Sequence, residues 1–393
     1  TTGFGSFDEA AKYFGGDFKA ANPYYWGWVT EIRIEAGEPD YRKHYALGRF
    51  SHELAYVMPD GKTAYMSDDG TNVGFFMFVA DRKADLGSGT LYAAKWHQHS
   101  AEGGGTASLE WISLGHGSDA EVRRAVDGRV QFSELFETAL PTDEYTCPKG
   151  FSMINTVGQT ECLKLRIDRY PEKVLSRLES RRYAALKGAT TEFRKEEGIT
   201  YDPMRKRLYV GMSSLSHGML EADETFDAGG PDHIRLKKNG CGAVYALNVA
   251  PTVQKDSDGN AIDSEYVVSD MQTLLSGVPK IYGAESAYAG NECDVNGIAN
   301  PDNLTYLPGA DLLVIGEDSR KHVNNMLWSY HVESGRLARI ATLPEGAEAT
   351  SPYWVEDING YDYLTLVVQH PSDEHNESYV GVFGPFDTAT GNR

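Results

Sequence analysis

The sequence lacks several features that would assign the protein to a familiar class. Its apolar residues never form a run approaching the ~20 residues that a membrane-spanning helix requires. Basic residues are also scarce, since 37 Lys and Arg stand against 57 Asp and Glu and leave a formal net charge of −20. Nucleic acids and anionic membranes are bound by clusters of Lys and Arg. The sequence therefore predicts a soluble, acidic protein with no nucleic-acid partner and no membrane span.

Cysteine is scarce as well, with four residues in 393, and none of them forms a Cys-x-x-Cys zinc or redox motif. An even number of cysteines favours two disulfides and an oxidising compartment, with free structural thiols as the alternative. Cys147 and Cys162 flank a loop rich in turn residues, an arrangement in which a disulfide would close the base of the loop. Pairing in sequence order predicts Cys147–Cys162 and Cys241–Cys293, one of three possible connectivities.

Several catalytic motifs are also missing. The sequence has no Gly-x-Ser-x-Gly nucleophile turn and no His-Glu-x-x-His metal-binding helix. The segment 61–63 reads Gly-Lys-Thr, but Tyr56 stands where a phosphate-binding loop needs its first glycine. This segment is therefore interpreted as a hairpin turn.

An internal repeat is the most informative feature that the sequence does contain. Four segments each begin with an acidic residue and continue as a short strand, a Pro/Asp/Gly turn and a second apolar strand; the acids are Glu53, Glu197, Asp302 and, in a weaker fourth repeat, Glu348. Further strands follow the hairpins at 89–96, 242–249 and 326–332. Repeated units of a hairpin and a strand are typical of β-propeller blades, which bury their faces by stacking on neighbours.

We therefore expect an all-β fold, a single β-propeller domain over residues 1–393 with about five or six blades. Loop and helical insertions are expected near 98–190 and 215–238, where the repeat is interrupted. Closing the ring of blades also predicts that the two ends of the chain lie close together.

The repeated acids predict a metal site. Innermost strands line the channel of a propeller, so acids at equivalent positions converge, and clustered carboxylates repel one another unless cations lie between them. Hard oxygen ligands suit calcium or trivalent iron better than zinc. The simpler interpretation of any one acid is that it caps a turn. Further ligand candidates close the second strands of the hairpins: Asp68, Asp69, Glu317 and Asp318.

Cationic residues lie close in sequence to these proposed ligands. Arg49 precedes Glu53 by four residues, and Arg194 and Lys195 immediately precede Glu196 and Glu197. Cations at such positions either offset carboxylate charge or hold an anionic substrate.

At these residues the sequence resembles the PhoX-type alkaline phosphatases, a secreted propeller family long catalogued as a bacterial domain of unknown function. The resemblance covers most of the chain, from about Asn22 to Pro371, and each of its segments alone is a weak signal. The segments that carry it are 46–53 (Ala-Leu-Gly-Arg-Phe-Ser-His-Glu), 65–69 (Tyr-Met-Ser-Asp-Asp), 193–199 (Phe-Arg-Lys-Glu-Glu-Gly-Ile), 301–304 (Pro-Asp-Asn-Leu), 346–348 (Gly-Ala-Glu) and 368–371 (Val-Gln-His-Pro).

The resemblance implies a metal-dependent phosphatase that hydrolyses phosphomonoesters in the periplasm or outside the cell. Its metals, iron and calcium around a bridging oxygen, stabilise charge on the phosphoryl oxygens, while Arg or Lys holds the phosphate. Arg49 and Lys195 then become the catalytic candidates. The metal-ligand candidates are Glu53, Glu197, Asp302, Glu317, Asp318 and Glu348.

One family feature has no counterpart in this chain. The family carries an upstream segment with a Trp-Gly-Thr stretch and a Cys-Glu-Glu motif that binds iron, whereas no cysteine precedes Cys147 here. That segment either lies upstream of this sequence or has been lost. Calcium binding depends less on it than iron binding does. A non-catalytic calcium-binding propeller, serving as a structural or surface-assembly protein, is therefore the alternative to the phosphatase.

Overall fold

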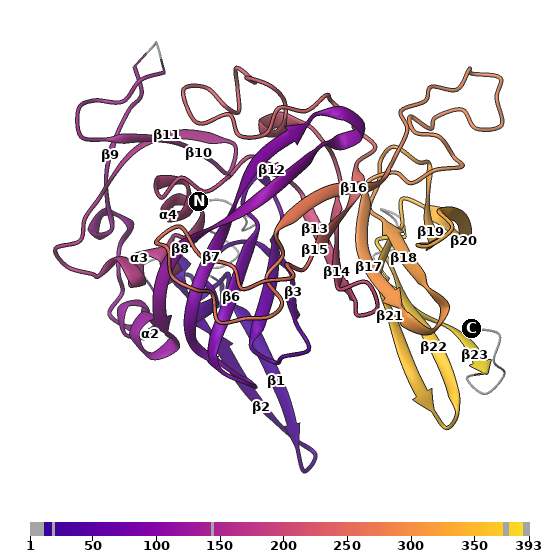
Figure 1. Ribbon diagram of the computed structural model, residues 1–393, viewed down its shortest axis with the longest axis horizontal. Coiled ribbons are helices and arrows are strands. Elements are labelled where there is room, and N and C mark those ends of the chain that lie inside the picture. The colour runs from indigo at the N-terminus through magenta and orange to yellow at the C-terminus, as the bar shows by residue number, and fades with distance from the viewer. Residues whose placement is uncertain (1–11, 18–19, 143–144, 372–376, 388–393) are drawn as a thin grey trace.

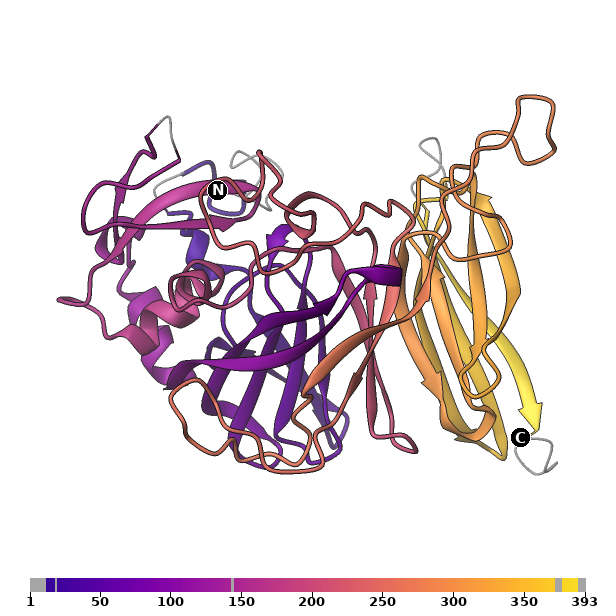
Figure 2. The same cartoon turned by 45° about the horizontal axis from the view of Figure 1, so that its top comes forward.

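The computed structural model of the chain describes residues 12–17, 20–142, 145–371 and 377–387. Most of these residues lie in β-strands, and the sheets follow one another across the molecule in chain order (Figures 1 and 2). We divide the main sheets into four units of antiparallel strands. No helix in the described ranges is long and apolar enough to cross a membrane.

The first two units lie in one nine-stranded sheet, in which β8 pairs with β7 on one side and with β16 on the other. Their strands are β3 (His52–Val57), β4 (Thr63–Asp68), β6 (Phe76–Arg82), β7 (Asp85–Ser100) and β8 (Thr106–Ser118), followed by β13 (Glu196–Asp202), β14 (Arg207–Met212), β15 (Ala243–Asn248) and β16 (Asp270–Ser276).

The third and fourth units are separate sheets of four and three strands. Their strands are β17 (Pro301–Leu307), β18 (Leu312–Glu317), β19 (Asn324–His331) and β20 (Arg336–Glu345), then β21 (Glu348–Ile358), β22 (Tyr361–Gln369) and β23 (Tyr379–Asp387).

The remaining elements form small sheets and helices around the first unit. These are β1 (Val29–Glu35), β2 (Glu38–His44), β5 (Thr71–Val73), β9 (Phe136–Ala139), β10 (Ser152–Thr156), β11 (Gln159–Leu165) and β12 (Phe193–Arg194), with the helices α2 (Asp119–Asp127), α3 (Glu172–Leu178) and α4 (Ser180–Leu186). Short 3-10 helices occupy Pro23–Tyr25, Tyr45–Leu47, Glu102–Gly104, Phe132–Glu134, His217–Met219 and Pro308–Ala310.

The first strands of the four units line up side by side. Strand β13 contacts β3 and β17, and β17 in turn contacts β21. Antiparallel sheets stacked in this order are propeller blades, so the predicted all-β, propeller-like fold is confirmed. The described residues contain four such units, fewer than the predicted five or six, and within them no strand pairing joins β21 back to β3. The chain ends, which we expected to be neighbours, lie outside the described residues.

Local turn chemistry explains why the hairpins form where the repeat predicts them. In the first unit, Oδ1 of Asp60 accepts hydrogen bonds from the backbone N–H groups of Lys62 (3.0 Å) and Thr63 (2.9 Å). The intervening Gly61 has φ +68°, a conformation that glycine adopts without steric cost. In the second unit, Asp202 accepts from the N–H of Met204 at 2.8 Å in the same way. Asp at a turn satisfies the backbone groups that the strands leave unpaired.

The hydrophobic core lies between the units rather than inside any one of them. One buried cluster joins the first and second units, a second joins the second and third, and a third joins the third and fourth. The other face of the first unit packs on α2, α3 and α4 through residues such as Phe76, Leu91 and Leu178. Each unit therefore depends on its neighbours for burial, as stacked repeats do.

Both predicted disulfides are confirmed. Cys147 bonds to Cys162, with Cα atoms 5.6 Å apart, and Cys241 bonds to Cys293, with Cα atoms 6.0 Å apart. All four cysteines of the sequence are therefore oxidised. The predicted insertion near 98–190 holds the three helices and β9 to β11, but it also includes β8, which belongs to the nine-stranded sheet. The insertion near 215–238 has no strand and one 3-10 helix.

Candidate functional site

The acid that opens each of the first three units lies at the same structural position. In each case the register between the first two strands shifts immediately around it, between His52 and Ala55, between Glu196 and Ile199, and between Pro301 and Leu304. Glu53, Glu197 and Asp302 are the first residues inside these bulges. A β-bulge re-aims a side chain that would otherwise follow the pleat of the strand.

A second repeated feature confirms that these three positions are equivalent. In each of these three units, the residue that follows the second strand donates its backbone N–H to a carbonyl oxygen two residues before the acid. The three hydrogen bonds run from Asp69 to Ser51 (2.9 Å), from Ser213 to Lys195 (3.1 Å) and from Asp318 to Asn300 (3.3 Å). The first three units therefore have the same backbone arrangement around the acid, although their side chains differ.

The fourth unit departs from the predicted alignment. Its register shift falls between Thr350 and Tyr353, so Ser351 occupies the position equivalent to Glu53, Glu197 and Asp302. Glu348 stands three residues earlier, at the start of β21. Aligning Glu348 with the other acids was therefore wrong in register, although its side chain reaches the same cavity.

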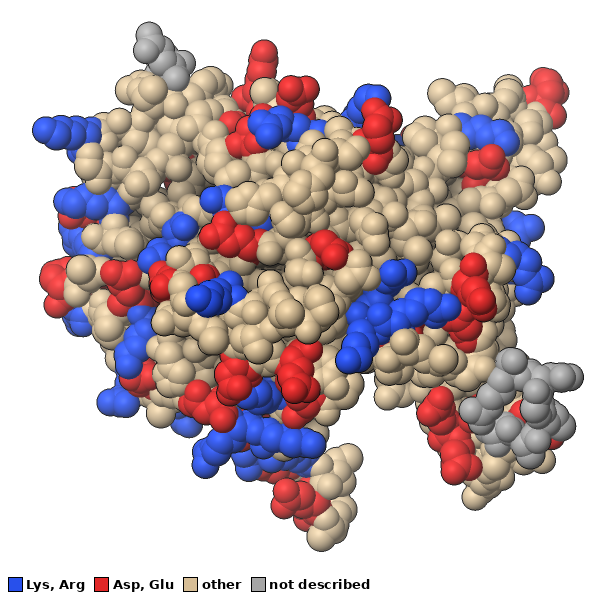
Figure 3. Space-filling model, in the orientation of Figure 1, with Lys and Arg blue, Asp and Glu red and all other residues tan. Residues whose placement is uncertain are grey.

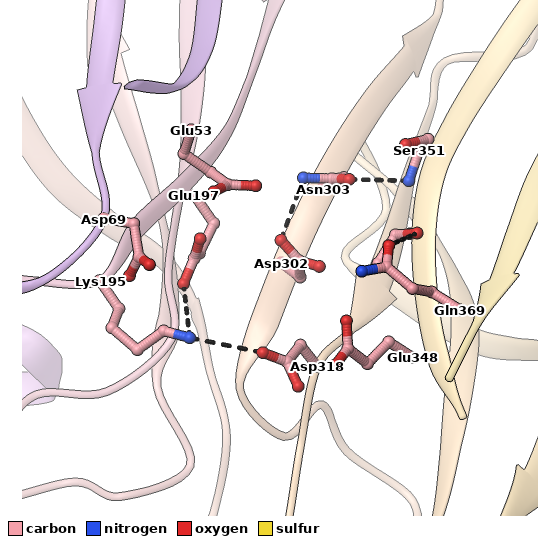
Figure 4. Close-up of a pocket in the computed structure, with 11 residues that line it drawn as sticks. Glu53, Asp69, Lys195, Glu197, Asp302, Asn303, Asp318, Glu348, Ser351 and Gln369 are labelled. Atoms are coloured by element: carbon pink, nitrogen blue, oxygen red, sulfur yellow. Dashed lines mark hydrogen bonds and ion pairs between the residues drawn. The ribbon is translucent and has the colours of Figure 1, made fainter. Parts of the chain in front are cut away.

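These residues line one cavity of about 220 Å³ where the four units meet (Figure 4). Carboxylate oxygens of Glu53, Glu197 and Asp302 lie within 4.8 Å of one another. The full lining comprises Glu53, Asp69, Lys195, Glu197, Asp302, Asn303, Asp318, Glu348, Thr350, Ser351 and Gln369. Six of these eleven side chains are carboxylic acids, and only one is a cation.

Strand alternation separates the neighbouring acids at the end of β18. Asp318 lines the cavity, whereas Glu317 points to the opposite side and is fully buried. Glu317 accepts hydrogen bonds from the N–H groups of Ala299 (2.8 Å) and Met326 (2.9 Å) and from Nε1 of Trp328 (2.7 Å). The structure therefore does not bring Glu317 to the other candidate ligands. Asp68 and Asp69 divide similarly: Asp68 forms a buried ion pair with Arg181, and Asp69 lines the cavity.

Lys195 supplies the positive charge of the cavity. Its Nζ lies 3.1 Å from Oε1 of Glu197 and 3.4 Å from Oδ2 of Asp318 (Figure 4). Desolvation lowers the pKa of this ammonium group, but the attraction of Glu197, Asp69 and Asp318 outweighs it and holds the pKa above its usual value. The residue has φ +49°, which is sparsely populated for a side chain other than glycine. The backbone is thus held in an unfavourable conformation where the cation meets the acids.

The single positive charge of Lys195 does not neutralise the carboxylates of the cavity, and four of them have raised pKa values. Burial raises the pKa of Glu197 to about 7, opposed by Lys195 and reinforced by Asp69 and Glu53. Burial, followed by repulsion from Glu197 and Glu53, raises the pKa of Asp302 well above its ordinary value. Glu53 is exposed on the cavity wall, yet the surrounding protein and then Asp69 raise its pKa too. Desolvation and Asp318 raise the pKa of Glu348.

Two neutral side chains that sequence reasoning missed hold the acids in place. Nδ2 of Asn303 donates to Oδ1 of Asp302 at 3.0 Å, and its Oδ1 accepts from the N–H of Ser351 at 2.7 Å (Figure 4). Oγ of Ser213 donates to Oε1 of Glu197 at 3.0 Å. The Asp-Asn pair at 302–303 was part of the resemblance, but no spacing rule marks Asn303 as a bridge between units.

Arg49 does not lie in this cavity. Its guanidinium donates to the carbonyl oxygens of Trp26 (2.9 Å) and Pro23 (2.9 Å) and lies over the ring of Tyr24. It lines a different and larger cavity of about 1260 Å³, together with Arg181. The structure therefore brings Lys195, but not Arg49, to the acidic residues.

Comparison with known families identifies the chain. The family described as alkaline phosphatase PhoX matches residues 1–371. The chain belongs to the PhoX family. Among solved structures, Pseudomonas fluorescens PhoX in complex with vanadate, a transition state analogue, matches with a TM-score of 0.57 and 20% identity, over 91% of this chain and 57% of that one. The present chain therefore spans little more than half the length of that PhoX protein.

Other structural matches of this PhoX-family chain are much weaker. A luciferin-regenerating enzyme has a TM-score of 0.26 and 9% identity, over 91% of this chain and 96% of that one. Sqt1 of Saccharomyces cerevisiae has a TM-score of 0.27 and 8% identity, over 86% and 76%. No curated protein matches the sequence.

Proposed function

We propose that the chain hydrolyses phosphomonoesters with the help of metal ions held by the carboxylates of the four-unit cavity. The convergence of Glu53, Glu197 and Asp302 from three separate units is the observation that carries this proposal. Membership of the PhoX family supports it. Asp318 and Glu348 complete the proposed ligand set, from which we leave out Glu317 because its oxygens are already hydrogen-bonded.

The donor set fits hard cations. Carboxylates crowded into a small cavity with raised pKa values are short of positive charge, and all the acidic donors are oxygen atoms, which calcium prefers. A thiolate from within this chain is not available to iron, because all four cysteines form disulfides. We therefore propose calcium as the principal metal, with iron bound only through oxygen ligands.

Each residue of the cavity has a role in this proposal. Bound cations would stabilise the negative charge that develops on the phosphoryl oxygens. Lys195 has three N–H donors and two carboxylate neighbours, so one donor remains for a phosphate oxygen. Asn303 and Ser213 orient Asp302 and Glu197, which keeps the ligand oxygens directed into the cavity. The volume of about 220 Å³ suits a phosphate group and part of a small ester.

The disulfides support a location for this reaction. Two disulfide bonds persist in an oxidising compartment. We therefore propose that the protein acts in the periplasm or outside the cell on small phosphorylated substrates.

The proposal is tested by loading purified chain with calcium, with and without iron, and measuring release of p-nitrophenol from p-nitrophenyl phosphate. Glu197→Gln is expected to reduce the rate at least 100-fold, because mutation of even the groups that hold a metal ligand in place costs about 10- to 100-fold in metal affinity or activity. Glu356→Gln, an exposed acid on β21, is the matched control and should leave the rate unchanged.

Two results would count against the phosphatase. Hydrolysis that survives in Glu197→Gln would place the chemistry outside this cavity. Stoichiometric calcium binding by the wild-type chain without any hydrolysis would favour the non-catalytic calcium-binding propeller.

A further inference from the structure

A second group of carboxylates lies in the segment 220–236, away from the cavity of the four units. Asp223, Asp227 and Asp232 belong to this segment, and Glu192 lies against it, because Oε2 of Glu192 accepts from the N–H of Ile234 at 2.6 Å. None of the four lines the carboxylate cavity. The segment falls in the insertion predicted near 215–238, yet Asp227 is only 6% exposed and Glu192 only 2%.

Within the part of the chain that the structure describes, these four acids have no Lys or Arg bound to them. Among the described residues, none of the four forms an ion pair with Lys or Arg. Glu192 lies 3.5 Å from Nδ1 of His233, but desolvation lowers the pKa of that imidazole to about 4, so it is neutral at pH 7. A buried carboxylate without a counter-charge is strongly disfavoured, so it must take up a proton or a cation.

Unused hydrogen-bonding capacity points to a ligand at Asp227. Neither Oδ1 nor Oδ2 of Asp227 makes a hydrogen bond of good geometry among the described residues, although the Asn72 side chain and the Asp223 backbone lie close enough to lower its pKa. Asn72, on β5, is fully buried beside it; its Nδ2 donates to the carbonyl oxygen of Phe226 at 3.0 Å, which leaves its Oδ1 without a partner. Three buried oxygen atoms from two side chains are therefore unsatisfied, which is rare in folded proteins.

The backbone at Gly218 allows Asn72 and Asp227 to approach closely. A Cβ atom at this position would lie 2.5 Å from Nδ2 of Asn72 and 3.1 Å from Oδ1 of Asp227. Any residue other than glycine would therefore displace the side chains that meet there.

We propose that Asp227 and Asn72 form a separate calcium site that ties the segment 220–236 to β5. Their carboxylate and amide oxygens are hard donors, and calcium accepts the irregular mixture of carboxylate, amide, backbone and water oxygens that a loop provides. Asp223 and Asp232 add long-range attraction for a cation. This site is independent of catalysis and serves to order the loop.

A protonated Asp227 is the competing state. Without a cation, desolvation, then Asp232 and Asp223, raise the pKa of Asp227 to about 8. The two states differ in a measurable way, because only the calcium site changes the metal content of the chain.

The test is a count of bound calcium. Chain stripped with EGTA is reloaded with Ca²⁺, passed through gel filtration and measured by elemental analysis, with Mg²⁺ as a comparison. Asp227→Asn preserves shape and removes one charge, and is expected to lower the content by one calcium per chain. Glu224→Gln removes an exposed charge from the same loop and should leave the content unchanged.

Calcium bound in the carboxylate cavity must be distinguished from calcium bound at Asp227. For this purpose the count is repeated in a Glu197→Gln/Asp302→Asn variant, which lacks two of the proposed cavity ligands. The one-ion difference caused by Asp227→Asn should persist there, whatever happens to phosphatase activity. If Asp227→Asn does not fold, Ca²⁺ should still raise the melting temperature of the background variant with Asp227 intact. An unchanged calcium content on Asp227→Asn, or no rise in melting temperature, would overturn the proposal and leave Asp227 protonated.

Discussion

Burial of the Glu197 carboxyl has opposite effects on the stability of the metal-free chain and on the binding of a cation. The residue is 3% exposed, and its carboxyl accepts one hydrogen bond from Ser213 and forms an ion pair with Lys195. Burial nevertheless dominates and raises the pKa of Glu197 to about 7. In the absence of metal such a group favours its neutral form. A bound cation reverses that preference, so the same burial that weakens the empty site increases its demand for positive charge.

We expect the metal-free chain to lose stability as the pH rises from about 4.5 to about 7. A carboxyl with a raised folded-state pKa binds its proton more tightly when folded, so its contribution is full below the unfolded pKa and is lost as pH passes the folded pKa. A shift from 4.5 to about 7 corresponds to about 3 kcal/mol. Urea unfolding in EDTA at pH 4.5 and 7.5 measures the difference.

Glu197→Gln should reduce this pH dependence by about 3 kcal/mol, whereas Glu356→Gln should retain all of it. The other carboxyls with raised pKa values, such as Asp302, should leave a remainder of the same sign in both variants. Equal pH slopes in wild type and Glu197→Gln would show that Glu197 ionises freely in the folded chain.

At the scale of elements, the ends of β4 and β18 direct two neighbouring acids to opposite sides. Side chains alternate along a strand, so Glu317 and Asp318 cannot face the same way. Glu317 enters the core of the third unit and Asp318 enters the cavity. The bulge in the facing first strand then places Asp302 beside Asp318. The alternation of side chains along the second strand therefore determines which acid faces the cavity, and the bulge in the first strand determines the direction of the acid opposite it.

Glu317→Gln is therefore expected to affect folding rather than metal binding. Its amide would present an N–H group to the N–H donors of Met326 and His322, which leaves buried donors unpaired. Breaking such a buried network costs about 3–5 kcal/mol. The free energy of unfolding should fall by roughly that amount, while calcium per folded chain stays at the wild-type value. A loss of calcium without a loss of stability would instead make Glu317 a ligand.

At the scale of the whole molecule, the cavity joins four units that otherwise contact one another in series. Glu53, Glu197, Asp302 and Glu348 each belong to a different unit. The large negative charge is not one continuous surface: on the face in Figure 3, acidic and basic side chains are interspersed. Six carboxylates are instead gathered in the cavity where the units meet.

Chelation should therefore lower the stability of the whole chain. A cation bound only by the folded state stabilises it by about 4 kcal/mol at a concentration 1,000-fold above its dissociation constant. EGTA should lower the melting temperature of the wild-type chain, measured by calorimetry. Glu53→Gln, Asp302→Asn and Glu348→Gln should each reduce that change, although they alter three different units. A change of equal size in all variants and in wild type would show that the cavity contributes no metal-dependent stability.

The parts of the fold and the site that could be predicted are those with a local cause. Turn residues such as Asp60 and Asp202 act within three residues, so the hairpins and the propeller-like class were predictable. The acid that opens each hairpin was visible for the same reason. The weaker fourth repeat misled the alignment, because its bulge lies three residues later and nothing in the local pattern marks it.

The sequence by itself determined the repeated hairpins and the acids available for a site, and it limited the disulfides to three possible connectivities, of which the structure shows one. Short-range hydrogen bonding and chain connectivity are enough to specify these features. Only the tertiary structure decided that Asp318 rather than Glu317 faces the cavity, that Arg49 lies elsewhere and that Asp227 is buried. Side-chain direction depends on bulges, strand register and contacts between units far apart in the chain, and a one-residue change of register turns a side chain to the opposite face.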